Sequence, residues 1–249
     1  MTDKTNIIRR FLAGGMAVAM TALISHAEIA LPDIISNNMV LQQQSDARLW
    51  GWSSPGAVIT VIPGWDGRTY TVKADRNGRW DVAVATTDAG YTPHTLSISG
   101  DGSDIKVENI LIGEVWFCSG QSNMEMPLNG FWCQPVENAG RAIAYAGRYP
   151  GVRVATVERK GEYEPQTAAA GKWKESKATA YFFARSLNDI LGVPVGVINC
   201  SLGGSRVEGW MPKWKLDTYP DCDVAKEKAT PDSVLHLWER INIMYNAML

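Results

Sequence analysis

The chain has few of the residues that mark metal, redox or nucleic-acid-binding proteins. It holds three histidines and four cysteines in 249 residues, and no cysteine pair has the spacing of zinc ligands. Basic and acidic side chains number 24 and 26, and no basic block occurs, which argues against a nucleic-acid binder. A hydrophobic content of 45% excludes a disordered chain, a collagen-like fibre and a coiled coil.

Long apolar runs are confined to the first 27 residues. Lys4, Arg9 and Arg10 precede an uncharged stretch over residues 11–24, and the small residues of Ser25-His26-Ala27 follow it. This order predicts a secretory signal sequence over residues 1–27. The stretch is short for a membrane span, which needs about 20 apolar residues. We therefore expect a secreted or periplasmic protein that does not associate with the membrane after cleavage.

Secretion changes the interpretation of the cysteines, because an oxidising compartment permits disulfides. Cys118 and Cys200 each end an apolar run, which favours small buried core residues. Cys133 and Cys222 lie in polar, proline-containing loops and are the better candidates for a bridge. The sequence does not decide whether they pair.

Residues 28–110 have the pattern of an all-β domain. Turn residues separate short strand candidates at regular spacing, which predicts a β-sandwich. Within residues 79–85 apolar and other side chains alternate with the period of a half-buried strand. The strand candidates are residues 48–52, 57–63, 69–74, 79–85, 94–99 and 105–111.

Residues 111–249 alternate strands and helices instead. Apolar strands are predicted over 113–118, 152–157 and 195–200, with helices over 136–146 and 179–191. The second helix places Phe182, Phe183, Leu187, Ile190 and Leu191 on one side, and Gly192 caps it. Such alternation predicts a parallel sheet covered on both faces, with ligands beyond the carboxyl ends of the strands.

Two loops at predicted strand ends carry candidate chemistry. Ser122 follows a strand behind Gly120, whose freedom permits the tight turn that presents a nucleophile. The G-x-S-x-G pattern is absent because Met124 takes the second glycine position, and a serine that merely satisfies turn amides is the alternative. Gly203 and Gly204 follow the other strand, where paired glycines let backbone N–H groups approach an oxyanion. A plain strand-to-helix turn is the alternative there.

Residues 116–128, WFCSGQSNMEMPL, resemble the nucleophile block of the sialate O-acetylesterase family, a branch of the SGNH hydrolases. Residues 191–212, LGVPVGVINCSLGGSRVEGWMP, resemble its second block, and the resemblance covers about residues 31–215. It implies an incomplete α/β/α SGNH domain after the β-sandwich. Ser122 would be the nucleophile and one oxyanion donor, and the Gly203–Gly204 pair would give a second, with Gly204 favoured. The substrate would be an O-acetylated sugar, most typically sialic acid, with no metal or cofactor.

The sequence departs from the family at the general base. The family takes a further oxyanion donor from an Asn block and the base from an Asp-x-x-His pair, and neither block is present. We expect His94 to be an exposed turn residue of the β domain and His236 to lie on the face of an amphipathic helix. Asp232 lies four residues before His236 and does not fit the motif. The base stays unassigned, and the sequence is expected to match the first part of such an esterase.

Two functions remain open from the sequence. The first is a carbohydrate O-acetylesterase, a serine ester hydrolase that would be very poorly active as this chain alone. The second is a non-catalytic secreted carbohydrate-binding fragment, because the chain contains ten tryptophans and exposed tryptophan often binds sugars. The oligomeric state is open.

The predicted signal sequence can be tested on secreted protein. We expect the mature chain to begin at or near Glu28, since signal peptidase reads the small residues before it. N-terminal sequencing of exported material measures this directly. Soluble protein that keeps Met1 in the cytoplasm would contradict the prediction.

Overall fold

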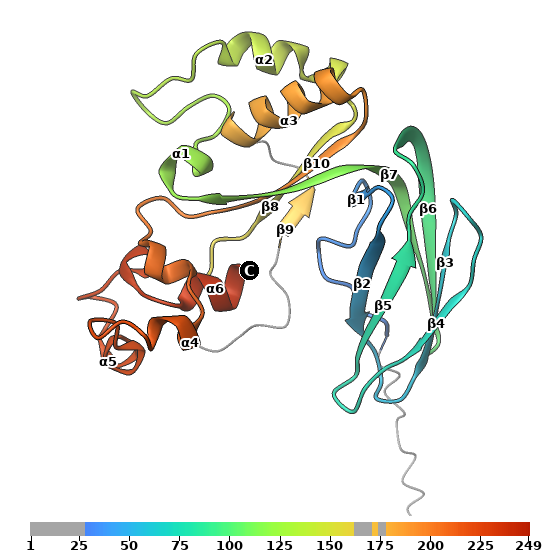
Figure 1. The fold of residues 1–249 in the computed structure, drawn as a ribbon, viewed down its shortest axis with the longest axis horizontal. Helices are drawn as coiled ribbons and strands as arrows, with labels where there is room; N and C mark the ends of the chain where they lie inside the picture. Colours follow the sequence, from blue (N-terminus) through green and yellow to red (C-terminus); the bar gives the residue numbers. More distant parts are fainter. Residues whose placement is uncertain (1–27, 162–170, 174–177) are drawn as a thin grey trace, which may run out of the picture.

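The computed structural model describes residues 28–161, 171–173 and 178–249 (Figure 1). The predicted signal sequence over residues 1–27 lies outside the described residues. Within the described ranges, no helix combines the length and apolar character needed to cross a membrane.

The first part of the described chain consists of strands, as the sequence predicts. No helix is present between residues 45 and 100, all of which the structure describes. β2 and β5 form a separate antiparallel two-stranded sheet, whereas the other strands belong to one eight-stranded sheet. The strands here are β1 (Val40–Gln42), β2 (Asp46–Trp52), β3 (Val58–Pro63), β4 (Tyr70–Lys73), β5 (Arg79–Ala85) and β6 (Gly90–Gly100).

The two sheets of this region share one apolar core. Leu49 and Trp80 from the small sheet pack in the same cluster as Ile59, Leu96 and Ile98 from the large sheet. All five side chains are at most 1% exposed. Burying a large apolar side chain contributes about 1.5–3 kcal/mol, so this cluster supplies much of the stability of the β region. A closed, separate β-sandwich domain stays a prediction, because the large sheet continues past residue 110.

One long strand, β7 (Ser103–Gly120), joins the β region to the rest of the molecule. Its first half pairs antiparallel with β6, and its second half pairs parallel with β10 (Val195–Ser201). The sequence predicts two strands here, with a domain boundary at residues 110/111, and the structure places that boundary inside β7. The strand continues because Ile110, Leu111 and Ile112 are all buried and no proline interrupts the ladder.

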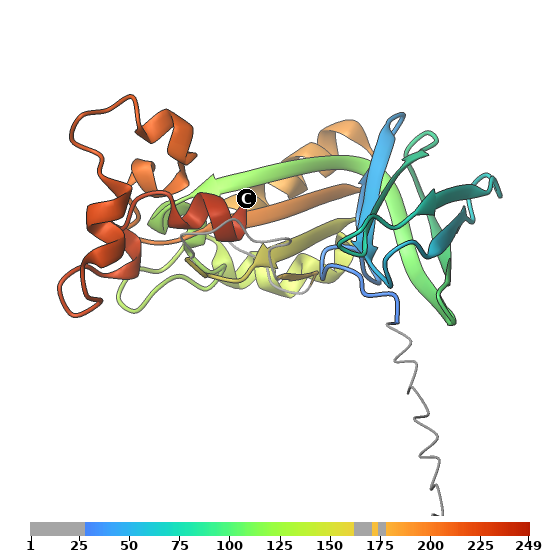
Figure 2. The same cartoon turned by 90° about the horizontal axis from the view of Figure 1, so that it is seen from below.

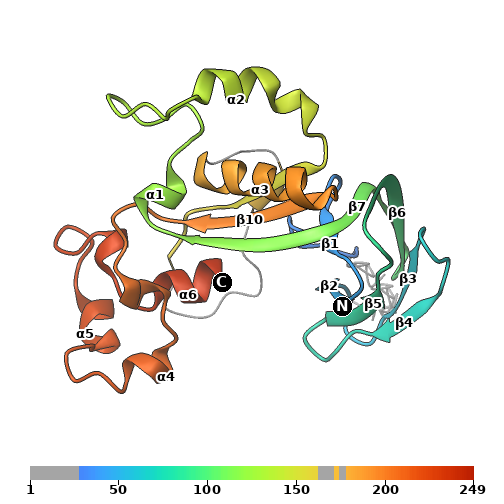
Figure 3. The same cartoon turned by 45° about the horizontal axis from the view of Figure 1, so that its top comes forward.

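The second part is a mixed sheet between helices, as Figures 2 and 3 show. β8 (Val152–Val157) pairs parallel with β10, and β9 (Gly171–Trp173) pairs antiparallel with β8 at the edge. The predicted parallel strands are confirmed, and β9 was missed. The helical elements are α1 (Ser122–Glu125), α2 (Ala139–Tyr145), η1 (Ala146–Arg148), α3 (Ala178–Leu191), η2 (Val207–Trp210), α4 (Lys213–Leu216), α5 (Val224–Ala229), η3 (Leu237–Glu239) and α6 (Ile243–Met248).

Helices cover both faces of this sheet. α3 packs on one face through Ala180 and Ala184, against Val195 and Val197 of β10. α6 packs on the other face, where Met244, Met248 and their neighbours surround Cys200 and Leu202. The sheet is therefore buried from both sides, as its near-continuous apolar strands indicate.

The buried face of α3 differs from the predicted one. The large side chains Phe183, Ile190 and Leu191 are 37%, 78% and 49% exposed, whereas Ala180 and Ala184 are at most 1% exposed. Small alanines allow the helix axis to approach the sheet closely. Of the predicted residues, Leu187 packs against the same cluster as these alanines, whereas Phe183, Ile190 and Leu191 face outward. The predicted cap at Gly192 is confirmed, since this residue has φ +67° and its N–H donates to the Asn188 carbonyl.

All four cysteines are free thiols in the structure. The candidate bridge between Cys133 and Cys222 is not formed: Cys133 is exposed in a turn and Cys222 is half-buried before α5. Cys200 is fully buried as predicted, and burial raises its pKa to about 12. Its thiol therefore stays protonated, and it donates to the Met248 carbonyl oxygen.

Gly113 marks the closest backbone approach along β7. A Cβ at this position would lie 2.1 Å from the Pro194 carbonyl oxygen, which accepts a hydrogen bond from Glu114. We expect Gly113→Ala to lower the free energy of unfolding by about 1–3 kcal/mol, because overpacking displaces backbone. The measurement is urea unfolding followed by circular dichroism.

Gly140→Ala in α2 is the matched control for this change. A Cβ at Gly140 meets no atom within 4 Å, and alanine favours a helix by up to about 1 kcal/mol. This variant should be as stable as the wild type or more so. Equal stabilities of Gly113→Ala and the wild type would show that β7 and the β10 loop separate easily.

Candidate active site

The two loops predicted to carry chemistry follow adjacent strands that end at the same edge of the sheet. In the parallel ladder Ser201 of β10 pairs with Gly120 of β7. The next residue, Leu202, donates its N–H to the Gly120 carbonyl at 3.1 Å. The segments beyond both strands therefore leave the sheet side by side. In Figure 3 these segments are α1, which follows β7, and the turn that follows β10.

Ser122 is the first residue of α1 and is exposed at this edge. Gly120, two residues earlier, has φ +151°, a conformation that glycine adopts without strain. A Cβ on Gly203 would lie 3.7 Å from the Ser122 Cα, so the structure brings these two predicted residues together. Among the residues that the structure describes, the Ser122 hydroxyl has no hydrogen-bond partner.

Side chains from two elements hold the short helix that carries Ser122. Asn199 of β10 is fully buried, and its amide donates to the Met124 carbonyl oxygen at 3.2 Å. The Thr179 hydroxyl, at the start of α3, donates to the Asn123 carbonyl oxygen at 2.7 Å. A four-residue helix is too short to be stable alone, so these contacts fix the position of Ser122.

Glu125 is a site residue that the sequence reasoning missed. It lies at the end of α1, three positions after Ser122, and its carboxylate accepts the Gly203 N–H. The same carboxylate pairs with Arg159, which follows β8. An Asp or Glu three residues after a candidate nucleophile on a helix faces the same side, and that spacing was the available signal.

This contact corrects the predicted oxyanion donors. The Gly203 N–H is engaged by Glu125, so it does not point at a substrate oxygen. Gly204 is exposed with φ +76°, and its N–H donates to no other residue in the described part of the chain. The pair therefore offers one donor, Gly204, which is the residue that the sequence favoured.

Trp238 closes one side of the Gly204 turn. Its Cδ1 atom would lie 3.4 Å from a Cβ on Gly204. The His236 ring stacks on the Trp238 ring with centroids 4.7 Å apart and an interplanar angle of 25°. His236 therefore lies on the Gly204 side of the site, but no hydrogen bond joins its ring to Ser122 within the described residues.

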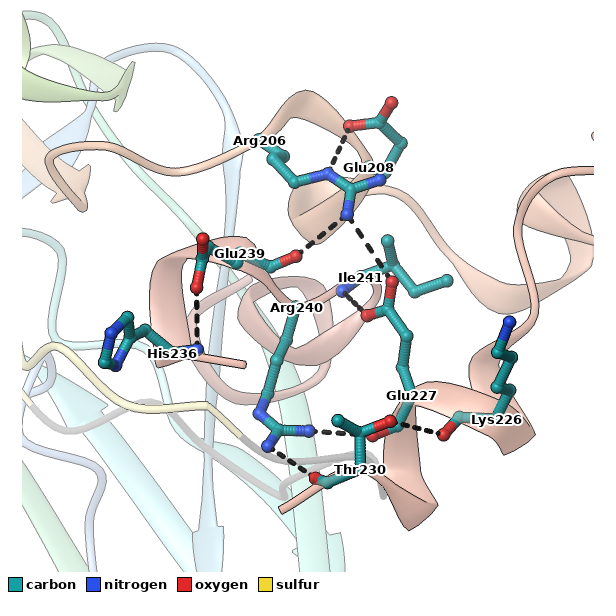
Figure 4. Close-up of polar contacts among 9 residues, drawn as sticks. All are labelled: Arg206, Glu208, Lys226, Glu227, Thr230, His236, Glu239, Arg240 and Ile241. Atoms are coloured by element: carbon teal, nitrogen blue, oxygen red, sulfur yellow. Dashed lines mark hydrogen bonds and ion pairs between the residues drawn. The ribbon is translucent and has the colours of Figure 1, made fainter. Parts of the chain in front are cut away.

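His236 does not lie on the predicted amphipathic helix. It has extended backbone and precedes the short 3-10 helix η3, and the Glu239 carboxylate accepts its N–H at 2.8 Å. A turn over residues 232–234, in which the Val234 N–H donates to the Pro231 carbonyl oxygen at 2.9 Å, takes the place of the start of the predicted helix. In Figure 4 the imidazole points away from the arginine network beside it.

That network fixes the loop that carries Trp238. The Arg206 backbone N–H donates to the Trp238 carbonyl at 3.1 Å, and its guanidinium donates to the Glu239 carbonyl at 3.0 Å. Arg240, whose side chain is 6% exposed, donates to the Glu227 carbonyl at 2.8 Å (Figure 4). Arg206 thus bonds to two backbone carbonyls of the loop, and Arg240 ties the loop to α5. These contacts fix the position of the His236–Trp238 pair.

His94 is not an exposed turn residue as predicted. It lies within β6, paired with Ile110, and is half-buried with its ring edge-on to Trp65 at 5.9 Å. Burial lowers its pKa below the ordinary value. Its position in the β region separates it from the loop cluster at the sheet edge. Within the described residues no group of three or more His, Cys, Asp or Glu side chains is arranged to bind a metal ion.

Glu125 provides a test of how the Gly203–Gly204 turn is held. Glu125→Ala removes the acceptor for a half-buried N–H, so we expect the free energy of unfolding to fall by about 1–3 kcal/mol. Asp217→Ala is the control, because it breaks the Lys213–Asp217 pair, whose side chains are 62% and 52% exposed. An exposed pair contributes about 0–1 kcal/mol. Equal losses in chemical unfolding would contradict a specific role for Glu125.

Comparison with known proteins gives the chain a set of relatives. No protein-family model matches it. The sialate O-acetylesterases of Pongo abelii and Homo sapiens are each 28% identical to it over 240 residues, covering 86% of this chain and 44% of the relative. The mouse protein of the same name is 28% identical over 206 residues, covering 73% of this chain and 37% of the relative.

A solved structure shows the same relationship. The crystal structure of a carbohydrate acetylesterase from Xanthomonas citri superposes with a TM-score of 0.72 at 32% identity, covering 89% of this chain and 47% of that one. The chain therefore spans about half the length of the relatives it matches. The resemblance predicted from the two sequence blocks is confirmed: over most of its length, this chain is homologous to the sialate O-acetylesterases.

Proposed function

We propose that this chain carries the nucleophile half of a carbohydrate O-acetylesterase, a serine ester hydrolase that acts on O-acetylated sugars and most typically on sialic acid. One observation carries the proposal. Ser122 and the Gly203–Gly204 turn lie next to each other at the carboxyl edge of the sheet, and both the Ser122 hydroxyl and the Gly204 N–H lack partners among the described residues. The names of the relatives support the same chemistry.

The proposed reaction has two steps. The Ser122 oxygen attacks the acetyl carbonyl carbon, and the carbonyl oxygen becomes an oxyanion that accepts hydrogen bonds from the N–H groups of Ser122 and Gly204. Collapse breaks the ester bond, the sugar hydroxyl leaves with the proton that Ser122 lost, and the acetyl group remains on Ser122. Water then hydrolyses the acetyl-serine to acetate and free serine.

A general base is needed in both steps, and none is assigned here. A serine hydroxyl is a weak nucleophile at neutral pH without an adjacent base, and the sequence contains no Asp-x-x-His pair. We therefore propose that this chain alone turns over slowly. His236 is the alternative base, because it approaches the Gly204 turn through Trp238.

A non-catalytic carbohydrate-binding role is the second candidate. Trp132 is 93% exposed and Trp214 is 72% exposed, and exposed indole rings bind sugar faces. Under this alternative, sugar binding would persist and no acetyl-enzyme would form. We also propose that the protein acts outside the cytoplasm, on the basis of its first 27 residues.

Ser122→Ala is the decisive change. We expect the wild-type chain to release acetate from O-acetylated sialic acid or 4-nitrophenyl acetate at well below about 1 per second, a usual enzyme rate, and Ser122→Ala to abolish this residual release. Mass spectrometry of the wild type after 4-nitrophenyl acetate treatment should find one acetyl group on the peptide that contains Ser122.

Ser36→Ala serves as the control, because Ser36 lies in the β region and its hydroxyl donates to the nearby Asp33 carbonyl oxygen. It should leave acetate release unchanged. Equal release from Ser122→Ala and the wild type would contradict the nucleophile assignment. Fast turnover that depends on both Ser122 and His236 would replace the slow-turnover proposal with His236 as the base.

A further inference from the structure

A pocket of about 700 Å³ lies between α2, η1 and α3. Figures 1 and 3 show α2 lying over α3 on the side of α3 away from the sheet. The walls include three arginines, Arg141, Arg148 and Arg185. No residue of the proposed active site lines it, and its volume is that of an ordinary small-molecule site, about 300–1,000 Å³.

The three guanidinium groups lack acceptors. None of them forms a hydrogen bond or an ion pair with another residue in the described ranges. Glu137 is the one carboxylate among the lining residues, and Asp189 lies nearby, 3.4 Å from the Tyr149 hydroxyl. Three arginines less these two carboxylates leave one net positive charge. Each guanidinium presents five N–H donors and no acceptor, so the pocket has donors in excess.

One donor of the pocket lining, on Arg185 of α3, is buried and has no acceptor. The Arg185 Nε is buried without a hydrogen-bond partner, and so is the Tyr181 hydroxyl one helical turn before it. Burial also raises the pKa of Tyr181, so the phenol stays protonated. Buried polar atoms are rarely left without partners in native proteins. Arg185 lines the pocket, whereas Tyr181 lies on the same helix outside the lining, so the argument for a ligand rests on Arg185.

Aromatic rings hold the arginines in place. The Arg148 guanidinium lies 4.2 Å from the centroid of the Tyr145 ring. The Arg185 guanidinium lies 5.1 Å from the Phe182 ring and 5.8 Å from the Tyr149 ring. Such contacts engage the face of the guanidinium and leave its in-plane N–H groups for other partners. The arginines are therefore ordered before any anion arrives, which lowers the entropy cost of binding.

We propose that this pocket binds the carboxylate group of a small organic anion, either an acidic sugar or a simple organic acid. One net positive charge matches a monoanion better than the roughly dianionic phosphate. Planar guanidinium groups pair with carboxylates through two parallel hydrogen bonds. The proposal does not depend on the activity of Ser122. The pocket and the proposed active site are separated along α3. Arg185 of the pocket lies six residues after Thr179, which bonds to α1, and six residues span about 9 Å along a helix.

Calorimetric titration of the full chain tests the site, with D-galacturonate, D-galactose, lactate and inorganic phosphate as the probes. Galacturonate and galactose differ in the carboxylate, so we expect the first to bind and the second not to bind. Arg185→Gln and Arg148→Gln should each weaken galacturonate binding about tenfold or more, because each removes charge-assisted hydrogen bonds. Circular dichroism would verify that both variants remain folded.

Arg48→Gln and Ser122→Ala are the controls. Arg48 is an exposed arginine of β2 that pairs with Asp81, so its loss should leave galacturonate binding unchanged, as should loss of the proposed nucleophile. Lactate, a monoanionic organic acid, that binds as tightly as galacturonate would support the carboxylate site and assign it to organic acids. Four outcomes would each overturn the proposal. Galactose could bind as tightly as galacturonate, or phosphate could bind tenfold more tightly. Galacturonate binding could be unaffected in both arginine variants, or it could be lost in Ser122→Ala.

Discussion

The parallel pairing of β10 with the second half of β7 determines where the candidate site lies. Because Ser201 pairs with Gly120, both chains leave the sheet at the same level and their following loops meet. A register shift of one residue would turn every side chain of one strand to the opposite face. It would also separate Ser122 from the Gly203–Gly204 turn. The close approach of Gly113 to Pro194 fixes this register at the start of the pairing.

A carboxylate organises the site before any substrate is present. Glu125 joins three segments, since it lies on α1, accepts the Gly203 N–H and pairs with Arg159 beyond β8. Gly203 is thereby engaged within the turn, and the Gly204 N–H is the one available for the oxyanion of the proposed reaction. The free N–H of Gly204 costs little in the absence of substrate, because Gly204 is exposed to water. Donors oriented in advance need no reorganisation when charge develops on the substrate.

α3 links the proposed active site to the arginine pocket. Its first turn bonds to α1 through Thr179, its inner face of alanines packs on the sheet, and its outer face contributes Phe182 and Arg185 to the pocket. Because small residues of α3 face the sheet, the helix lies close to it, and several of the larger side chains of α3 lie on the outer face. The pocket is thus a consequence of how α3 packs.

The sequence by itself determined much of the local structure and singled out the two loops as candidates for the site. Alternation within residues 79–85 and the apolar runs at 152–157 and 195–200 predicted their strands closely, because side-chain periodicity and β-branched content act within a few residues. The glycines at 120 and 204 signalled tight turns, which their positive φ angles confirm. Ser122 and Gly204 were therefore candidate site residues from the sequence alone, and their roles stay predictions.

Only the tertiary structure decided the features that depend on distant contacts. It joined two predicted strands into β7, half-buried His94 against Trp65, and took His236 out of its predicted helix. It assigned the Gly203 N–H to Glu125, 78 positions away in the chain, and it gathered three arginines from α2, η1 and α3 around one pocket. Hydrogen bonds and charges between remote segments leave no periodic signal in a sequence. Local patterns therefore predicted candidate site residues, and packing decided which partners those residues meet.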